Sequence, residues 1–232
     1  MPQKMTLEKC SVVIVAGGRG LRAGGDMPKQ FRLIGNKPML MHTIDAFYTY
    51  NRQMKIVIVL HPDYFAVWDN LCEKYRFTVP VVAVEGGETR FHSVKNGLSV
   101  VEDDEMVAVH DAARPFVLPE VIERCFRESF RFQCGVIPVV DEKNSVRILH
   151  PDGSSEPFDR DRIKLVQTPQ VFPAYLLKKA YDTDYKSHFT DDATVAEEAG
   201  IEIRLVEGNE ENIKITTPFD MLWASFFLKS GR

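Results

Sequence analysis

The chain has 232 residues, of which 44% are hydrophobic and 27% charged, and its formal net charge is −4. This composition is ordinary for a globular protein, and the length is enough for one well-filled α/β core, so we expect a single domain over residues 1–232. Residues 1–11 contain no charged-then-apolar leader, and no apolar run has the length of a membrane span. We therefore expect neither a signal peptide nor a membrane helix, and a cytoplasmic location.

The four cysteines, Cys10, Cys72, Cys125 and Cys134, lie far apart in the sequence. They show neither C-x-x-C spacing nor a histidine partner at metal-ligand spacing, in a chain without secretory features. We expect them to be small buried hydrophobic side chains.

The first predicted element is a strand at residues 12–15, VVIV, a β-branched run typical of a parallel strand covered on both faces. A loop with five glycines follows it: Gly17, Gly18, Gly20, Gly24 and Gly25. Glycine lets backbone N–H groups approach a ligand closely, as a phosphate cradle requires. Residues 19–37 carry five basic side chains and one acidic one, a local charge of +4. This cationic segment favours a small polyanionic ligand over a nucleic-acid surface.

Two other glycine motifs fit this loop less well. A Walker A loop needs a lysine and a hydroxyl residue after its last glycine, whereas Gly25 is followed by Asp26. The dinucleotide fingerprint is matched at Gly18, Gly20 and Ala23, but it should open directly into a helix. Because further glycines and prolines keep the chain irregular as far as Pro38, NAD binding is disfavoured.

Helical and strand patterns alternate in the next part of the chain. Helical spacing predicts a helix over 39–50, and continuous apolar runs predict strands over 56–60 and 78–84. Between these strands, Asp63 precedes a helix expected to end at about Lys74. Pro80 inside the second of these strands indicates an edge position. A second glycine turn, EGGETR at 85–90, precedes a helix expected over 91–101.

A strand predicted over 106–110 ends at Asp111 and Arg114, in the sequence HDAAR. Ligands of open α/β sheets lie beyond the carboxyl ends of the strands, so we expect both side chains near the glycine loop. A carboxylate there could hold Mg²⁺ through oxygen ligands and waters. The local alternative is an aspartate that caps the next turn and pairs with Arg114. A helix over 119–132 and a strand over 135–140 complete the regular alternation.

Between residues 141 and 167 the pattern changes to a polar hairpin, with strands at 145–149 and 154–160 around the turn HPDG. An isolated hairpin is marginally stable, which favours an arm that contacts something, such as a second subunit. The remaining patterns predict a strand over 163–166, helices over 174–181 and 192–199, a strand over 203–206, an extended segment at 213–215 and a helix over 218–229.

Six segments, in this order, resemble the 2-C-methyl-D-erythritol 4-phosphate cytidylyltransferases: AGGRGLRAGGDMPKQF at 16–31, EGGETRFHSV at 85–94, VHDAARPFV at 109–117, QTPQVF at 167–172, TDDA at 190–193 and NIKITTPFD at 212–220. The resemblance implies a Rossmann-like nucleotidyltransferase fold, an α/β fold with a mostly parallel twisted sheet flanked by helices. It also implies a homodimer built by a β-hairpin arm at about 141–162. The implied reaction is the Mg²⁺-dependent transfer of CMP from CTP to the sugar-alcohol phosphate, with release of pyrophosphate.

The resemblance implies roles for individual residues. Arg22 and Lys29 would stabilise the pentacoordinate phosphorus, and Asp111 would bind magnesium. Arg160 and Lys214 would grip the acceptor's phosphate, Arg160 within its own subunit or in the neighbouring one. The other implied contacts are with the nucleotide or the acceptor: Ala16, Gly17, Gly18 and Arg114 around the nucleotide, Gly87, Glu88 and Ser93 beside its cytosine and ribose, and Thr168 beside the acceptor.

Elementary chemistry agrees with this assignment. A phosphate monoester has a second pKa of about 6, so it is largely a dianion at neutral pH and needs no general base to attack phosphorus. The difficulty is to bring two polyanions together, which calls for fixed cations, backbone amides and a metal ion. The basic residues predicted at the loops are of the type that this task requires.

The sequence leaves two alternatives open. A ribitol-5-phosphate cytidylyltransferase would share the glycine loop, PKQF and TPQ, but its relatives tend to carry bulkier residues than Ala112 and Ala113. A non-catalytic nucleotide-binding protein would keep the fold and lose the chemistry, and the presence of Arg22, Lys29 and Asp111 argues against it. The sequence also departs from the family pattern at Ala23, where a methionine is common, and by extra residues within 141–147.

Overall fold

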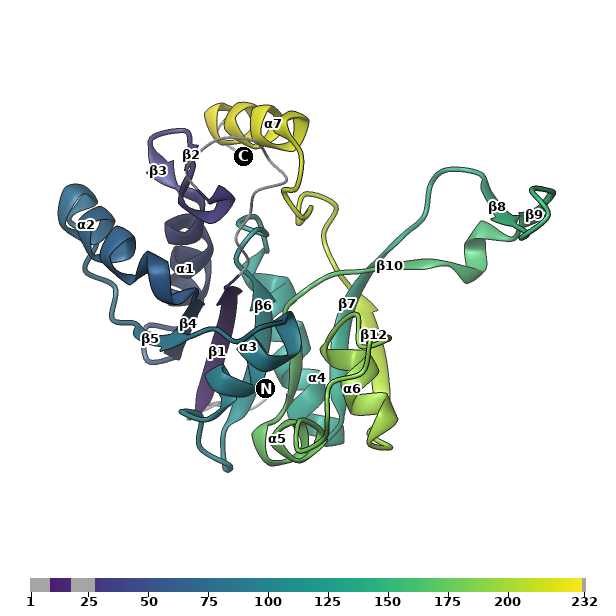
Figure 1. Cartoon of the computed structure of the whole chain (residues 1–232), viewed down its shortest axis with the longest axis horizontal. Coiled ribbons are helices and arrows are strands. Elements are labelled where there is room, and N and C mark those ends of the chain that lie inside the picture. Colours follow the sequence, from purple (N-terminus) through teal and green to yellow (C-terminus); the bar gives the residue numbers. More distant parts are fainter. Residues whose placement is uncertain (1–8, 18–27, 231–232) are drawn as a thin grey trace, which may run out of the picture.

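The computed structural model describes residues 9–17 and 28–230 of the chain. Its centre is a sheet in the order β10-β7-β11-β6-β1-β4-β5, with β12 paired to β7 (Figure 1). The bounds of the strands are β1 Cys10–Ala16, β4 Lys55–Leu60, β5 Val82–Glu85, β6 Met106–Asp111, β7 Gly135–Asp141, β10 Lys164–Val166, β11 Gln170–Pro173 and β12 Ile203–Glu207. Strand β1 lies between β4 and β6 and is parallel to both, while β10 and β11 run antiparallel to their neighbours. The sheet is therefore mixed and mostly parallel, as expected.

Helices cover both faces of this sheet, because its central strands are apolar on both sides. Val12 and Ile14 of β1 pack with α1 (Met39–Tyr50), α2 (Phe65–Tyr75) and α4 (Pro119–Phe132). Val13, which points the other way, packs with α3 (Arg90–Leu98), α5 (Ala174–Ala180) and α6 (Asp192–Glu198). The alternation of side chains along one strand thus divides the core into two layers.

A third, smaller cluster lies above the carboxyl ends of the strands. It joins the short hairpin of β2 (Leu33–Ile34) and β3 (Lys37–Pro38) to α7 (Pro218–Lys229), through the buried side chains of Ile34, Ile215 and Ala224. Helix α7 begins with a capping box in which Thr217 and Asp220 exchange hydrogen bonds with each other's backbone. The cluster brings residues from both ends of the chain to the same edge of the sheet.

The predicted elements are present, with three differences. One is the short hairpin of β2 and β3, which lies in a segment expected to be irregular. The strand expected over 78–84 is shorter and comprises only β5, and it is the edge strand that Pro80 indicated. Strand β11 was not predicted, because its four residues directly follow Pro169 and include the polar Gln170. It is fully buried between β6 and β7, where Val171 and Phe172 enter opposite layers of the core.

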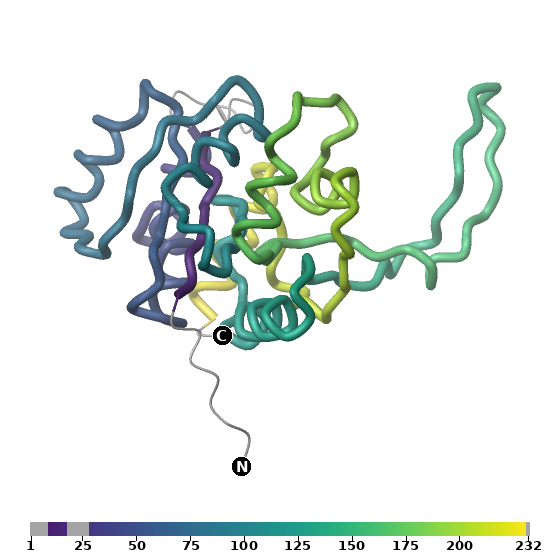
Figure 2. The backbone as a smooth tube through the Cα atoms, turned by 90° about the horizontal axis from the view of Figure 1, so that it is seen from below, coloured from purple at the N-terminus to yellow at the C-terminus, as the bar shows by residue number. Residues whose placement is uncertain are grey.

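The segment expected to form an arm is a hairpin that projects from the rest of the chain (Figures 1 and 2). Strands β8 (Val146–Leu149) and β9 (Ser155–Phe158) pair antiparallel and form a sheet of their own. A 3₁₀ turn at Arg160–Arg162 then returns the chain to the central sheet through β10. Leu149 near the hairpin turn is 75% exposed. A dimer contact by this hairpin stays a prediction.

Two expectations from composition are addressed by the structure. Cys10, Cys125 and Cys134 are buried free thiols, as predicted, while Cys72 is only partly buried. No helix formed by residues 9–17 and 28–230 combines the length and the apolar character that crossing a bilayer requires.

Candidate active site

The candidate site lies at the carboxyl ends of β1 and β6, which the sheet register places side by side. Val15 of β1 is paired with Asp111 of β6, so the first glycine loop begins next to the Asp111 side chain. Gln30, from the short turn at residues 29–31, donates a hydrogen bond of 2.8 Å from Nε2 to the carbonyl oxygen of Ala16. Gly18 and Arg22, two residues predicted for this site, lie outside the described residues.

Small residues of the two glycine turns pack around Ser93 on α3. A Cβ at Gly17 would lie 3.0 Å from Ser93 Oγ, and one at Gly86 would lie 3.2 Å from the same atom. The backbone N–H of Gly87 donates to Ser93 Oγ at 3.1 Å. A Cβ at Gly87 would meet that of His92 at 2.4 Å, so no larger residue fits there without movement. Ser93 therefore fixes the second glycine turn against the first.

Three cations surround the carboxylate of Asp111. Lys214 Nζ lies 3.0 Å from Oδ2 and Arg114 Nε lies 3.4 Å from Oδ2, while Arg90 Nε lies 3.6 Å from Oδ1. Burial alone would raise the pKa of Asp111, but the attraction of Arg90, Lys214 and Arg114 outweighs it and holds the pKa well below its usual range. Asp111 is therefore ionised at neutral pH, with 12% of its side chain exposed.

Lys29 and Lys214 reach this edge from opposite ends of the sequence. Lys29 Nζ donates to the carbonyl oxygen of Ile215 at 3.2 Å, directly beside Lys214. The backbone N–H of Ile215 in turn donates to the carbonyl oxygen of Ala113 at 2.9 Å, which attaches this segment to the end of β6. The predicted catalytic lysine and the predicted phosphate-gripping lysine are thus neighbours, although they come from different motifs.

A series of buried hydrogen bonds holds Asp111 in place from the interior of the fold. Thr168 Oγ1 accepts from the backbone N–H of Asp111 at 3.1 Å and lies 3.0 Å from His110 Nδ1. His110 Nε2 lies 2.9 Å from the carbonyl oxygen of Arg114 and must donate to it. Nδ1 of the neutral ring then accepts from the Thr168 hydroxyl. Thr168, expected to contact the acceptor, is 4% exposed and ties the QTPQ segment to β6 in this structure.

The guanidinium of Arg114 is held by the same network. It donates to the carbonyl oxygen of Asn212 at 2.7 Å and to that of Val166 at 3.3 Å. Asn212 Nδ2 donates to the carbonyl oxygen of Thr168 at 2.8 Å. Arg114 therefore connects three segments that converge here, at residues 111–114, 166–168 and 212–215.

Arg90 belongs to the EGGETRFHSV segment, and the sequence alone predicts no role for it. It is the first residue of α3, and its guanidinium donates two hydrogen bonds to the buried carboxylate of Asp192, at 3.0 and 2.6 Å. A signal was available in the sequence, since an arginine that follows a glycine turn at the end of a strand faces the same rim as Asp111. Its partner Asp192 lies far away in the sequence and could not be paired with it by pattern alone.

Arg160 is not brought to this site within the chain. It lies on the arm, in the 3₁₀ turn that follows β9, and its guanidinium donates to the carbonyl oxygen of Lys143 at 2.8 Å. The arm projects away from the carboxyl ends of β1 and β6 (Figure 1). The predicted residues that the structure assembles from the described part of the chain are Lys29, Asp111, Arg114, Thr168 and Lys214, with Gly17, Gly87 and Ser93 at the adjoining turns.

The donor set at this edge fits a magnesium ion only in part. Across residues 9–17 and 28–230, no group of three or more His, Cys, Asp and Glu side chains could hold a metal ion. Mg²⁺ in nucleotide sites is commonly bound by one or two carboxylates together with substrate phosphates and waters. The ionised, partly accessible carboxylate of Asp111 meets that requirement as a single protein ligand.

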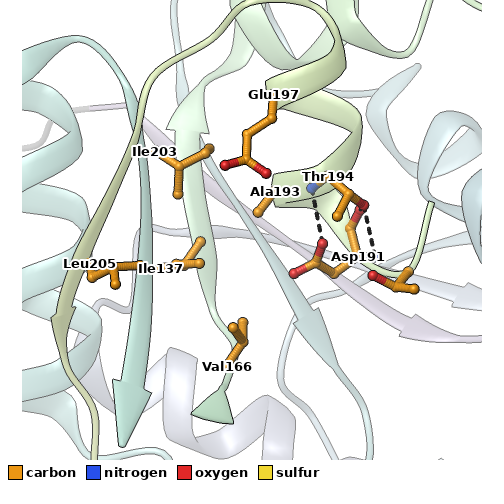
Figure 3. A pocket seen from close by; sticks show the side chains of 9 residues that line it. Ile137, Val166, Asp191, Ala193, Thr194, Glu197, Ile203 and Leu205 are labelled. Carbon is orange, nitrogen blue, oxygen red and sulfur yellow. Dashed lines mark hydrogen bonds between the residues drawn. The ribbon is translucent and has the colours of Figure 1, made fainter. Parts of the chain in front are cut away.

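A shallow cavity of about 450 Å³ lies elsewhere, between α6, β7 and β12 (Figure 3). It is lined by Ile137, Val166, Thr190, Asp191, Ala193, Thr194, Glu197, Ile203 and Leu205. Asp191 caps α6 there by accepting from the backbone N–H of Thr194 at 2.9 Å. None of the predicted site residues lines this cavity, so it does not belong to the candidate active site.

Comparisons with known proteins agree on one family. The profile of the 2-C-methyl-D-erythritol 4-phosphate cytidylyltransferases matches residues 10–230. The enzyme of that name from Phocaeicola vulgatus is 54% identical over 210 residues, which cover 90% of this chain and 95% of the relative. The one from Bacteroides thetaiotaomicron is 51% identical over 220 residues, covering 95% and 100%. A crystal structure of 4-diphosphocytidyl-2C-methyl-D-erythritol synthase from Anaerococcus prevotii has a TM-score of 0.80 at 27% identity, covering 95% and 98%.

Proposed function

The chain belongs to the 2-C-methyl-D-erythritol 4-phosphate cytidylyltransferase family and is a cytidylyltransferase, and we propose that it transfers CMP from CTP to 2-C-methyl-D-erythritol 4-phosphate with release of pyrophosphate. The observation that carries this proposal is the pairing of Lys214 and Arg114 with Asp111 at the carboxyl edge of the sheet, with Lys29 bound next to Lys214 on the carbonyl of Ile215. We place the reaction in the cytoplasm, as the sequence predicts.

The proposed reaction is an in-line substitution at phosphorus. A phosphate oxygen of the acceptor forms a bond to the α-phosphorus of CTP, and the bond from that phosphorus to the bridging oxygen breaks, so that pyrophosphate leaves. Because the acceptor phosphate is largely a dianion at neutral pH, no side chain has to remove a proton. Charge accumulates on the oxygens of the reacting phosphorus, and fixed cations stabilise it.

The residues at the edge supply such cations from rigid positions. Lys29, beside Ile215, would face the reacting phosphorus together with Arg22 of the glycine-rich segment. Lys214, 43% exposed, would bind the acceptor's phosphate while Asp111 holds its ammonium in place. Gly17, Gly87 and Ser93 would form the wall beside the nucleotide, and Glu88, an exposed residue that follows Gly87, would lie at its margin.

Magnesium would be bound by Asp111 and by the phosphates of CTP. When bound, it would neutralise charge on the triphosphate and so assist the departure of pyrophosphate. Asp111 suits this role because its lowered pKa keeps the carboxylate ionised at neutral pH.

Arg160 requires a second chain in this proposal. Since it lies on the projecting arm of its own chain, we assign it to the acceptor site of a neighbouring subunit in a homodimer. The exposed Leu149 and Ile148 of the hairpin provide apolar area for such a contact.

The experiment is a measurement of pyrophosphate release from CTP by the purified protein, with methylerythritol 4-phosphate and ribitol 5-phosphate offered separately. UTP serves as the nucleotide control, and EDTA removes the metal. Release that requires CTP, methylerythritol phosphate and magnesium supports the proposed reaction, its two substrates and its metal. A preference for ribitol phosphate would keep the mechanism and change the acceptor. Tight CTP binding without release from either acceptor would refute catalysis and favour a nucleotide-binding role.

A further inference from the structure

The guanidinium of Arg90 lies between two carboxylates that have very different surroundings. On one side Asp192 is fully buried and accepts hydrogen bonds from both terminal nitrogens of Arg90, at 3.0 and 2.6 Å. On the other side Arg90 Nε lies 3.6 Å from Oδ1 of Asp111, at the rim of the candidate site. Arg90 therefore links Asp111, at the edge of the sheet where the proposed reaction takes place, to Asp192 in the interior of the fold.

The buried end of this arrangement is fixed from three directions. Asp192 is the first residue of α6, and Arg90 is the first residue of α3. The hydroxyl of Tyr181, which follows α5, also donates to Asp192 Oδ1 at 2.6 Å. A bidentate arginine–carboxylate pair has a defined orientation, so the plane of the Arg90 guanidinium is set by α3, α5 and α6 together.

The aromatic ring of Tyr181 is itself held in place. It stacks on Phe91, the residue after Arg90, with ring centroids 4.7 Å apart. Both rings are buried in the layer of the core that covers this face of the sheet. Arg90 is thus positioned by packed side chains and cannot easily follow a movement of Asp111.

At the end near the candidate site, different cations contact the two oxygens of the Asp111 carboxylate. Arg114 and Lys214 approach Oδ2, whereas Arg90 approaches Oδ1. Contacts at one oxygen already restrict the rotation of a carboxylate about its Cβ–Cγ bond, and a contact at the second oxygen, here from Arg90, restricts it further. The contact with Arg90 consequently sets the orientation in which Asp111 faces Lys214.

We propose that Arg90, held by Asp192 and Tyr181, is a positioning residue for cytidylyl transfer that acts by fixing the Asp111 carboxylate. This inference rests on the proposed function, because it concerns the orientation of a carboxylate in that site. Arg90 is already paired with Asp192 and is assigned no contact with substrate. Its influence on the reaction passes through Asp111.

A double-mutant cycle tests whether Arg90 acts through Asp111. Arg90→Lys keeps the positive charge beside buried Asp192 but loses the rigid fork that reaches both carboxylates. Outer partners of a site residue are worth roughly 10- to 100-fold, so Arg90→Lys should lower kcat about tenfold and change the KM for CTP by less than about threefold. In the Asp111→Asn background, the same substitution should change kcat by less than about twofold.

Two further variants keep the test decisive. The pair Arg90→Gln with Asp192→Asn removes both buried charges together, so a folding defect from a lone buried charge is avoided. It should behave as Arg90→Lys does, with a comparable loss of kcat that disappears when Asp111→Asn is added. The control is Arg204→Gln, which removes an arginine paired with Glu202 on the exposed part of β12 and should leave kcat unchanged.

The outcomes separate this inference from the proposed function. An unsubstituted protein that releases no pyrophosphate from CTP and methylerythritol phosphate would refute the function and the role of Arg90 with it. If the protein is active and Arg90→Lys lowers kcat by the same factor in the unsubstituted and in the Asp111→Asn background, only the inference is refuted. Unchanged kcat in both Arg90→Lys and the pair variant would refute it as well.

Discussion

Nζ of Lys214 lies 3.0 Å from Oδ2 of Asp111, although the two residues come from opposite halves of the chain. The contact follows from the hydrogen bond between the N–H of Ile215 and the carbonyl of Ala113, which places residues 213–215 along the end of β6. Asp111 thereby fixes an ammonium group at the rim, where 43% of the Lys214 side chain remains exposed. Such an ammonium can bind a phosphate without a further rearrangement of the backbone.

Replacement of this lysine should weaken acceptor binding. We expect Lys214→Gln to raise the KM for methylerythritol 4-phosphate at least about tenfold, because one charge-assisted contact to a dianion is lost. The KM for CTP should change less. Steady-state kinetics with each substrate varied in turn measures both constants. Lys164→Gln is the matched control, since Lys164 of β10 has a similar exposure and pairs with Asp141 of β7. Equal increases in both KM values would contradict a specific role at the acceptor phosphate.

Lys29 should affect the chemical step more than binding. Loss of one electrostatic stabiliser commonly costs about a hundredfold or more in kcat, and we expect Lys29→Ala to show a loss of at least that size. Lys37→Ala, in the same basic segment but paired with Asp45, should retain kcat. Pre-steady-state measurement of the first turnover separates chemistry from product release. A kcat within a few-fold of the unsubstituted enzyme would remove Lys29 from the catalytic set.

The position of Arg160 on the arm leads to a prediction about subunit mixing. If its guanidinium completes the neighbour's acceptor site, Arg160→Ala and Lys29→Ala should each inactivate the homodimer. A heterodimer of the two variants should have one intact site, with roughly half of the activity of the unsubstituted dimer, because a two-fold dimer repeats each contact twice. Tandem affinity tags isolate that heterodimer. Absence of recovery in it would mean that each site is built within one chain.

The sheet could be predicted from sequence because its central strands are continuous apolar runs. The strands that contain residues 12–15, 56–60 and 106–110 are all buried on both faces, and this burial is what such a run indicates. Strand β11 could not be predicted, since it begins with Gln170 directly after Pro169. Gln170 is accommodated because its side chain pairs with Asp191 Oδ2 at 2.8 Å and with the N–H of Ala193 at 2.9 Å. These partners come from another part of the chain, and no local pattern reveals them.

The candidate site likewise contains residues whose position local sequence patterns predict and contacts that such patterns cannot predict. Asp111 and Arg114 are adjacent to the end of a recognisable strand, so their place at the rim follows from topology. The pairing of Arg90 with Asp192 depends on how α3 and α6 meet in space, and their separation in sequence conceals it. The support of Asp111 by Thr168 is also non-local, because β11 lies beside β6 and was not expected there.

A glycine on α3 provides a test of packing beneath the site. A Cβ at Gly97 would lie 2.5 Å from Val13 Cγ1 and 2.9 Å from Val59 Cγ2, both in the buried core. Alanine favours a helix over glycine by about 1 kcal/mol, but overpacking costs about 1–3 kcal/mol, so Gly97→Ala should lower the free energy of unfolding by up to about 2 kcal/mol. Urea unfolding measures the change. Lys95→Ala on the exposed side of the same helix should alter stability by less than about 0.5 kcal/mol. A stabilised Gly97→Ala variant would show that the helix can move outward at no cost.

His110 should make the protein less stable in mild acid. Burial lowers its pKa from 6.5 to about 4, because a charged imidazolium is disfavoured between Thr168 and the end of β6. Between these two values the unfolded chain binds a proton that the folded chain does not, so the free energy of unfolding falls as pH falls from about 6.5 to about 4. The loss attributable to this one residue is up to about 3 kcal/mol.

The contribution of His110 can be isolated from that of other titrating groups. His110→Gln should be less stable than the parent at pH 7 but should lose less of its remaining stability between pH 7 and 4.5, since no imidazole has to stay neutral. Urea unfolding at closely spaced pH values gives the slopes. The free energy of unfolding could instead fall with pH equally steeply for the parent and for His110→Gln. His110 would then be protonated to the same extent in the folded and unfolded states, and the fold would have to accommodate the buried ring as a cation.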